Sequence, residues 1–185
     1  MNREKGYKYK DEKHFMALAL AEAEQALAAG DYPVGAVLTL NGELLNKARN
    51  SLFTEQRWTA HAEHNLIYLN SENLLKLYRN GQPYDVCLYT TLEPCLMCLG
   101  IAMMHRVSKI IYACPDPHGG AANVDPERLG SFYPQHWPSF EMGTYKIESC
   151  DLIVDFLKQE KSTNWKVMLD AFQMMQERWR VDNGR

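Results

Sequence analysis

Two short segments of the chain contain residues whose types and spacing suit a metal site. They are His61-Ala-Glu63 and Pro94-Cys95-Leu-Met-Cys98. Cysteines three positions apart at the start of a helix place both thiols on one face, and the helix N-terminus favours their negative charge. One imidazole and two thiolates make an open tetrahedral zinc site, with the fourth position left for water. We therefore predict that His61, Cys95 and Cys98 hold Zn²⁺.

Glu63 stands two positions from His61 and can lie beside a water on the metal without binding the metal itself. A carboxylate in that place takes a proton from the water and returns protons to a substrate. Zinc lowers the pKa of such a water, so hydroxide is available near neutral pH to attack a ring carbon that bears an amino group. His-x-Glu followed by Pro-Cys-x-x-Cys is the signature of zinc deaminases that act on nucleobases. We assign Glu63 as the catalytic acid and base.

Other interpretations of the cysteines stay open at this point. A Cys-x-x-Cys pair also fits a redox centre or half of a closed structural zinc site, for which His64, Cys87 and His105 are formal fourth ligands. The five cysteines are an odd number, which argues against a disulfide framework. We expect Cys87, Cys114 and Cys150 to be small buried apolar residues.

The elements that would position these motifs alternate between helices and strands. A helix over 11–29 is capped by Asp11 and stopped by Gly30, and Asn41-Gly42 predicts a type I′ hairpin. Thr59 is a predicted cap for a helix from about Ala60, and Pro94 suits the first turn of a helix to about 105. Residues 71–84 are ambiguous, with a helical turn near 74–78. The remaining predicted elements are strands 33–40, 43–49, 85–91, 109–114 and 145–150, and helical residues 151–182 with a break near Ser162-Thr163.

This order predicts a three-layer α/β/α domain with a mixed sheet of about five strands. The 185 residues suit a single domain, with a core at about 11–125, an aromatic-rich segment at 115–143 and C-terminal helices at 151–182. Long segments inside compact domains are often functional. The aromatic-rich segment contains Trp137, and we treat substrate binding or a lid at Trp137 as a hypothesis, with packing onto the domain as the equal alternative.

With these motifs placed, residues 14–125 resemble the cytidine/deoxycytidylate deaminase superfamily, most closely its tRNA adenosine deaminase and guanine deaminase-like branch. The resemblance rests on four segments: Gly30 followed by Pro33-Val34-Gly35-Ala36, Asn50 before the histidine, Tyr89 to Cys98, and Arg106 to Ala113. It implies a cytidine deaminase-like fold, zinc bound across two helix N-termini, and substrate contacts at Pro33, Val34 and Asn50. It also implies a homodimer or tetramer assembled through the helices that flank the zinc, and of these we expect the homodimer.

The chain departs from that branch at three places. His64 replaces an aliphatic residue and is a candidate substrate contact, 65–83 is longer than usual, and 123–143 has no close match in the tRNA enzymes. The net charge of -3 gives no global basic field for nucleic acid. We therefore favour an amino-purine or amino-pyrimidine base, nucleoside or nucleotide as substrate, with tRNA wobble adenosine as the alternative. A non-catalytic binding subunit with structural zinc is the third interpretation, against which Glu63 argues.

Bulk composition limits the setting of the protein. Hydrophobic residues make up 46% and charged residues 23%, which is typical of globular proteins. No apolar run is long enough to cross a bilayer, and residues 1–13 lack the apolar stretch of a secretory signal. We expect no membrane partner and a reducing, cytoplasmic location.

Overall fold

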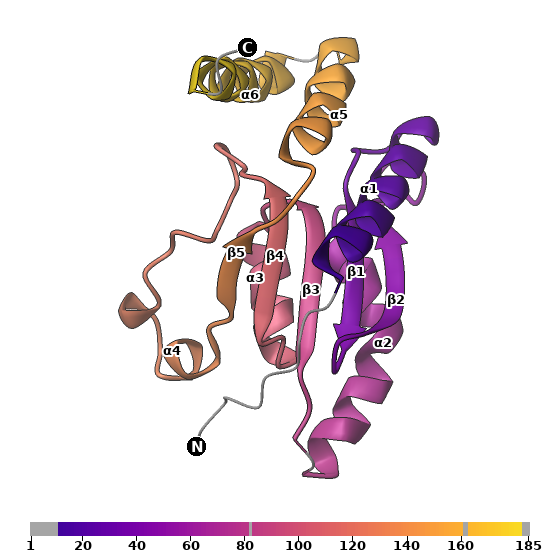
Figure 1. Cartoon of the computed structure of the whole chain (residues 1–185), viewed down its shortest axis with the longest axis vertical. Coiled ribbons are helices and arrows are strands. Elements are labelled where there is room, and N and C mark those ends of the chain that lie inside the picture. Colours follow the sequence, from indigo (N-terminus) through magenta and orange to yellow (C-terminus); the bar gives the residue numbers. More distant parts are fainter. Residues whose placement is uncertain (1–10, 82, 161–162, 183–185) are drawn as a thin grey trace.

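The computed structural model describes residues 11–81, 83–160 and 163–182 and has a mixed sheet at its centre (Figure 1). The five strands lie in the order β2-β1-β3-β4-β5. β1 (Gly35–Leu40) pairs antiparallel with both β2 (Glu43–Arg49) and β3 (Val86–Leu92). β4 (Lys109–Cys114) and β5 (Ser139–Met142) continue the sheet in parallel with β3. The predicted α/β class with a five-stranded mixed sheet is confirmed.

Helices cover both faces of this sheet, as predicted. α1 (Glu12–Ala28) packs on β1, β2 and β3 on one face, and α2 (Ala62–Arg79) packs with α3 (Leu96–Met104) on the other. Successive strand residues point to opposite faces, so Val37 and Tyr89 join the core under α1 while Leu38 and Leu88 join the core under α2 and α3. The three layers therefore follow from the alternation along each strand.

Two local signals in the sequence have the predicted geometry. Asn41 and Gly42 both have positive φ, 54° and 84°, which is the requirement of a type I′ turn between β1 and β2. The Asp11 carboxylate accepts a hydrogen bond of 3.3 Å from the backbone N–H of His14 and so caps α1. Gly35 permits close packing of β1 on α1, because a Cβ there would lie 2.1 Å from the carbonyl oxygen of Ala19. These residues fix how the first helix meets the sheet.

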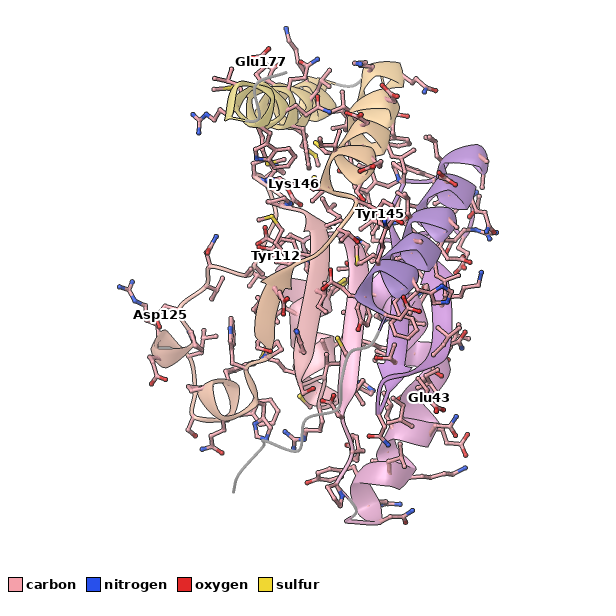
Figure 2. All side chains as sticks on the ribbon, viewed as in Figure 1. Glu43, Tyr112, Asp125, Tyr145, Lys146 and Glu177 are labelled. Atoms are coloured by element: carbon pink, nitrogen blue, oxygen red, sulfur yellow. The ribbon has the colours of Figure 1, made fainter. Side chains whose placement is uncertain are left out.

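The segment 115–143 contains more regular structure than the sequence predicted. It holds a 3₁₀ turn (Pro126–Arg128), the short helix α4 (Phe132–His136) and the whole of β5. The predicted strand at 145–150 is wrong, because α5 (Lys146–Gln159) begins there after Tyr145, whose φ is 62°. Figure 2 labels Tyr145 and Lys146 at this junction. The buried residues Cys150, Ile153 and Leu157 recur at helical spacing, which explains why a helix wins.

The chain continues from α5 into α6 (Thr163–Asp182), at the end of the sheet toward which β3 and β4 run (Figure 1). The predicted break near Ser162-Thr163 falls at 161–162, which lies outside the described residues. The ambiguous stretch from residue 71 belongs to α2 as far as Arg79. Among the described residues, no helix has both the length and the apolar character needed to span a membrane.

Candidate metal centre and cavity

The starts of α2 and α3 bring the two sequence motifs together. His61 is the N-cap residue of α2, and Cys95 is the N-cap residue of α3. The predicted starts at Thr59-Ala60 and Pro94 are therefore two residues early. The imidazole of His61 makes no capping hydrogen bond to α2, and it lies within reach of the thiols of Cys95 and Cys98 at the start of α3, so the three side chains are placed to share a metal. The two helix N-termini also favour negative charge at the thiols.

The donor atoms have the spacing of a tetrahedral zinc site. Nδ1 of His61 lies 3.7 Å from Sγ of Cys95 and 3.6 Å from Sγ of Cys98. Tetrahedral bonds of about 2.3 Å to sulfur and about 2.0–2.1 Å to nitrogen put the two atoms about 3.6 Å apart. These three side chains are also the one group of three possible metal ligands within the described parts of the chain. The residues present therefore fit zinc.

The two thiols differ in their affinity for protons. Hydrogen bonding from Cys98 and from His61 lowers the pKa of the Cys95 thiol to about 4, although burial opposes this shift. The contact with Cys95, together with burial, raises the pKa of Cys98 well above its ordinary value. Without metal, Cys95 is therefore the more acidic thiol of the pair. A zinc ion supplies the positive charge that allows both to ionise.

Glu63 lies beside the metal ligands and is buried, with 3% of its surface exposed. Its Oε1 accepts a hydrogen bond of 3.1 Å from the hydroxyl of Thr90 on β3, and its Oε2 lies 3.5 Å from Sγ of Cys98. Burial raises the pKa of this carboxyl. A raised pKa brings a carboxyl closer to neutral pH, where it both accepts and donates protons efficiently.

A cavity of about 250 Å³ opens next to this group. His61, Glu63 and Cys95 line it, so a ligand inside it would meet the metal site directly. The other lining residues come from the loop before β1, the loop after β2, the end of β3 and the loop that follows it, the loop after β4, and α6: Tyr32, Val34, Asn50, Leu52, Phe53, Trp58, Leu92, Glu93, Asp116, His118, Gly119, Trp165 and Met168.

Asn50 and Val34, two of the predicted substrate contacts, line this cavity. The side-chain oxygen of Asn50 accepts a hydrogen bond of 2.9 Å from the backbone N–H of Leu52. This contact fixes the amide and leaves its NH₂ group as the donor for a ligand. Pro33 is buried just before Val34 and is not among the lining residues. Pro33 directly precedes the lining residue Val34 in the chain.

The structure does not bring His64 or Trp137 to the cavity. The ring of His64 stacks on Tyr68 along α2, with centroids 6.3 Å apart. Trp137 packs against the core and contacts Phe140 of β5, with centroids 6.4 Å apart. The geometry therefore supports the packing alternative for Trp137, and it does not place this side chain near the metal ligands.

The sequence did not predict most of the aromatic residues that line the cavity. Phe53 and Trp58 follow Asn50 in the same loop, and that proximity was a usable signal. The buried carboxylate of Asp31 holds this loop, because it accepts hydrogen bonds of 2.7 Å from the backbone N–H of Phe53 and from the hydroxyl of Thr54. Trp165 carried no comparable signal, since its position depends on how α6 docks.

Glu93, in the second motif, lines the cavity and binds the loop after β4. Its carboxylate accepts hydrogen bonds from the backbone N–H groups of Asp116 (3.1 Å) and Ala122 (2.9 Å). Gly120 is required beside it, since a Cβ there would lie 2.4 Å from the carboxyl carbon. Glu93 therefore holds the loop after β4 against the metal-binding helix.

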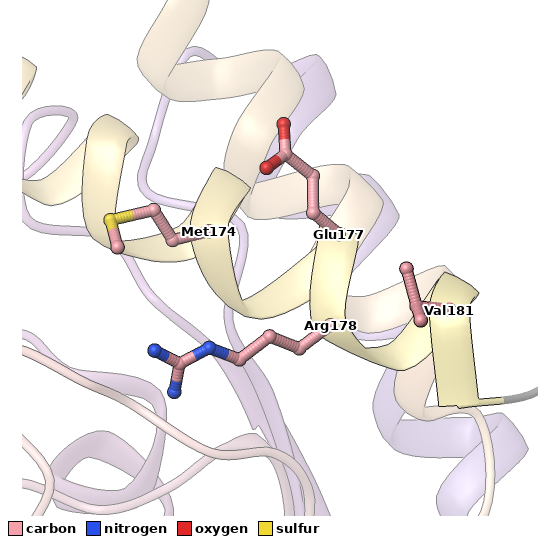
Figure 3. Close-up of a pocket in the computed structure, with 4 residues that line it drawn as sticks. All are labelled: Met174, Glu177, Arg178 and Val181. Atoms are coloured by element: carbon pink, nitrogen blue, oxygen red, sulfur yellow. The ribbon is translucent and has the colours of Figure 1, made fainter.

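A second hollow lies on the outer side of α6 (Figure 3). Met174, Glu177, Arg178 and Val181 line it, and Figure 3 shows all four side chains extending from this one helix. None of them belongs to the metal-ligand group, so we place the chemistry at the first cavity.

Fold and site together define a zinc-dependent hydrolase that acts on the C–N bonds of cyclic amidines. The family model for the cytidine and deoxycytidylate deaminase zinc-binding region matches residues 9–114, which is more than half of the chain. The protein belongs to this family of zinc-dependent deaminases. Its resemblance to the family, its cofactor and its hydrolytic deaminase activity are thereby established.

Individual similar proteins include tRNA-specific adenosine deaminases and, by fold alone, a guanine deaminase. A tRNA-specific adenosine deaminase of Bacillus subtilis is 40% identical over 110 residues, which are 60% of this chain and 66% of the relative, slightly less than two thirds of its length. The corresponding Agrobacterium fabrum protein is 32% identical over 80% of this chain and 95% of its own length. A solved structure from work on tRNA:A34 deaminases has a TM-score of 0.64 at 33% identity, covering 76% of this chain and 99% of that one. Guanine deaminase from Nitrosomonas europaea shares the fold, with a TM-score of 0.61 at 19% identity, over 84% of this chain and 97% of that one.

Proposed function

We propose that this protein deaminates a free base, nucleoside or nucleotide, with His61, Cys95 and Cys98 as zinc ligands and Glu63 as the proton carrier. The observation that carries the proposal is the position of Glu63. It is buried between Thr90 and Cys98 and lines the same small cavity as His61 and Cys95. A purely structural zinc site has no need of a buried carboxyl facing a cavity.

The chain's residues divide the chemical work among them. His61, Cys95 and Cys98 would hold Zn²⁺ in an open three-ligand site, and the bound metal would lower the pKa of a water that serves as the nucleophile. Glu63 accepts the proton of that water and delivers protons to the ring nitrogen and then to the leaving amine. The NH₂ group of Asn50 donates a hydrogen bond to the substrate and sets its orientation. Ammonia leaves, and a carbonyl replaces the amino group.

The size of the cavity supports a small substrate. Its volume of about 250 Å³ is below the range of about 300–1,000 Å³ that is usual for drug-sized ligands. A single heterocyclic base fits that scale. The net charge of -3 also gives no overall attraction for a polyanion.

The second candidate function is deamination of a tRNA wobble adenosine. Sequence similarity favours it, because the Bacillus and Agrobacterium relatives are tRNA-specific adenosine deaminases. A tRNA enzyme makes phosphate contacts, so its binding weakens steeply as salt concentration rises. Salt dependence therefore separates the two candidates independently of turnover.

A panel of substrates tests the proposal. Ammonia release is measured with the zinc-loaded protein on adenosine, guanine, cytosine, cytidine, a pterin and a tRNA anticodon hairpin. We expect turnover of at least one free compound, with little change between low and moderate salt. Turnover of the hairpin alone would transfer the assignment to the second candidate, and no turnover of any compound by protein with a full complement of zinc would support a non-catalytic subunit.

We also propose that the chain acts as one deaminase domain and forms a homodimer through α2 and α3. The outer sides of these two packed helices expose large apolar residues: Tyr68 (72%), Leu69 (64%), Leu96 (65%) and Met104 (64%). Exposed apolar groups of this kind mark interaction surfaces, and a two-fold dimer is the commonest way of covering one. Light scattering on Met104→Glu should show a monomer, while the control Leu44→Glu on β2 should stay a dimer. A monomeric parent protein would refute this assembly.

A further inference from the structure

α6 is fixed to the rest of the protein by several contacts. Phe172 is fully buried, and Gln176 donates a hydrogen bond to the carboxylate of Asp151 on α5. The ammonium of Lys146, at the start of α5, lies 3.6 Å from the centre of the Trp179 ring. These contacts bury apolar surface and pair polar groups from the middle of the helix onward. The first turns of α6 therefore have a defined position over the end of the sheet.

The N-terminal part of α6 joins an aromatic cluster. The ring of Trp165 stacks on Tyr32, with centroids 5.9 Å apart and planes inclined by 29°. Trp165 also meets the ring of Phe156 at 6.0 Å, edge to face, and Phe156 stacks on Phe53 at 6.2 Å. The cluster joins α6 and α5 to the loop before β1 and the loop that follows Asn50.

Members of this cluster form one wall of the cavity at the metal site. Tyr32, Phe53, Trp165 and Met168 all line it, together with His61 and Glu63. The family match ends at residue 114, so the two residues from α6 lie well outside the region that carries the zinc motifs. This wall is therefore a feature that the deaminase motifs do not themselves provide.

The cavity is lined by acidic residues and by no Lys or Arg within the described parts of the chain. Glu63, Glu93 and Asp116 contribute carboxyl groups to its lining, while no Lys or Arg is among the lining residues in the described parts of the chain. A phosphate needs cationic partners to replace its hydration, and a polynucleotide needs several. Carboxyl groups without such partners disfavour any phosphorylated ligand at this place.

We propose that Trp165, supported by Tyr32 and Met168, is the specificity-determining wall of this site, and that it selects an uncharged base or nucleoside. The inference rests on the proposed function and narrows its substrate class by excluding nucleotides. A flat heterocycle gains contact area and stacking against aromatic side chains without any charge.

Binding measured without turnover tests this wall. In a Glu63→Gln background, dissociation constants for adenosine, guanine, cytosine and cytidine are compared among the parent, Trp165→Ala and the matched control Val167→Ala, whose side chain is 61% exposed on the same helix. Loss of a stacking partner should weaken binding of the accepted compound at least about fivefold in Trp165→Ala. Val167→Ala should bind as the parent does, and Trp165→Phe should recover most of the loss.

The possible outcomes distinguish a failure of the proposed wall from a failure of the proposed function. Met168→Ala serves as a second, milder variant if Trp165→Ala unfolds, and thermal melting of each variant monitors the fold. Equal affinity of a folded Trp165→Ala and Val167→Ala for a compound that the parent deaminates would overturn the wall and leave the proposed function intact. Turnover of the anticodon hairpin alone by the parent would overturn both. Binding of a nucleoside 5′-monophosphate as tight as that of its nucleoside would overturn the exclusion of phosphate.

Discussion

The hydroxyl of Thr90 on β3 donates a hydrogen bond of 3.1 Å to Oε1 of Glu63 on α2. Thr90 is fully buried and Glu63 nearly so. The contact joins the central sheet to the helix whose first residues carry the metal-site chemistry. Because a strand moves less than a loop, this bond holds the carboxyl at a constant place beside the metal ligands.

Replacement of the proposed proton carrier should separate metal binding from catalysis. Glu63→Gln keeps the shape of the side chain but cannot accept the water's proton. We expect unchanged zinc content, measured by elemental analysis, and a rate of ammonia release lower by at least about two orders of magnitude. Turnover close to that of the parent would remove Glu63 from its assigned role.

Thr90→Val should affect the chemical step more than substrate binding. The variant keeps the shape of the side chain but leaves Oε1 of Glu63 without its partner. We expect kcat to fall about tenfold with KM within about twofold, since a misplaced general base loses part of a factor of about 10²–10⁴. Thr90→Ser retains the hydroxyl and should restore kcat. A rise in KM at constant kcat would place Thr90 in substrate binding instead.

Removal of zinc should expose one thiol selectively. Cys95 is partly accessible and has a pKa of about 4, whereas Cys98 is fully buried. Protein treated with a chelator should therefore be alkylated by iodoacetamide first at Cys95, and zinc should prevent the reaction. Mass spectrometry locates the label, and the buried Cys87, Cys114 and Cys150 act as internal controls. Equal labelling of Cys95 with and without zinc would exclude it as a ligand.

Trp137→Ala should change stability and not substrate handling. Trp137 packs against the core next to Phe140, and the cavity is lined without it. Because its ring is only partly buried, we expect a loss of about 2 kcal/mol in the free energy of unfolding, below the range of about 3–5 kcal/mol for fully buried aromatic residues. KM should stay within about twofold of the parent value. A large rise in KM at unchanged stability would restore the lid hypothesis of the sequence analysis.

The sequence predicted those features that depend on neighbouring residues. Asn41-Gly42 sets its own turn, and Asp11 caps its own helix. The spacing of Cys95 and Cys98 holds in any helix start. His61 was predicted as the third ligand from the order of motifs that deaminases share. Sequence spacing alone does not place His61 next to Cys95.

The parts that escaped prediction depend on contacts between distant segments. β5 is a short strand of four residues, with little buried surface of its own, and it exists because it pairs with β4. Trp165 reaches the cavity because α6 is held in position by the burial of Phe172, farther along the same helix. No local pattern around 139–142 or 165 reports either contact.

The place of α6 in the chain bears on the way the enzyme is made. All three proposed metal ligands and all five strands precede α6 in the chain, so the elements that hold the metal leave the ribosome before the helix that contributes to the cavity wall. Trp165 and Met168 can therefore complete the cavity after the metal ligands have come together. We expect metal loading to be fast on the nascent chain and zinc exchange in the finished enzyme to be limited by undocking of α6.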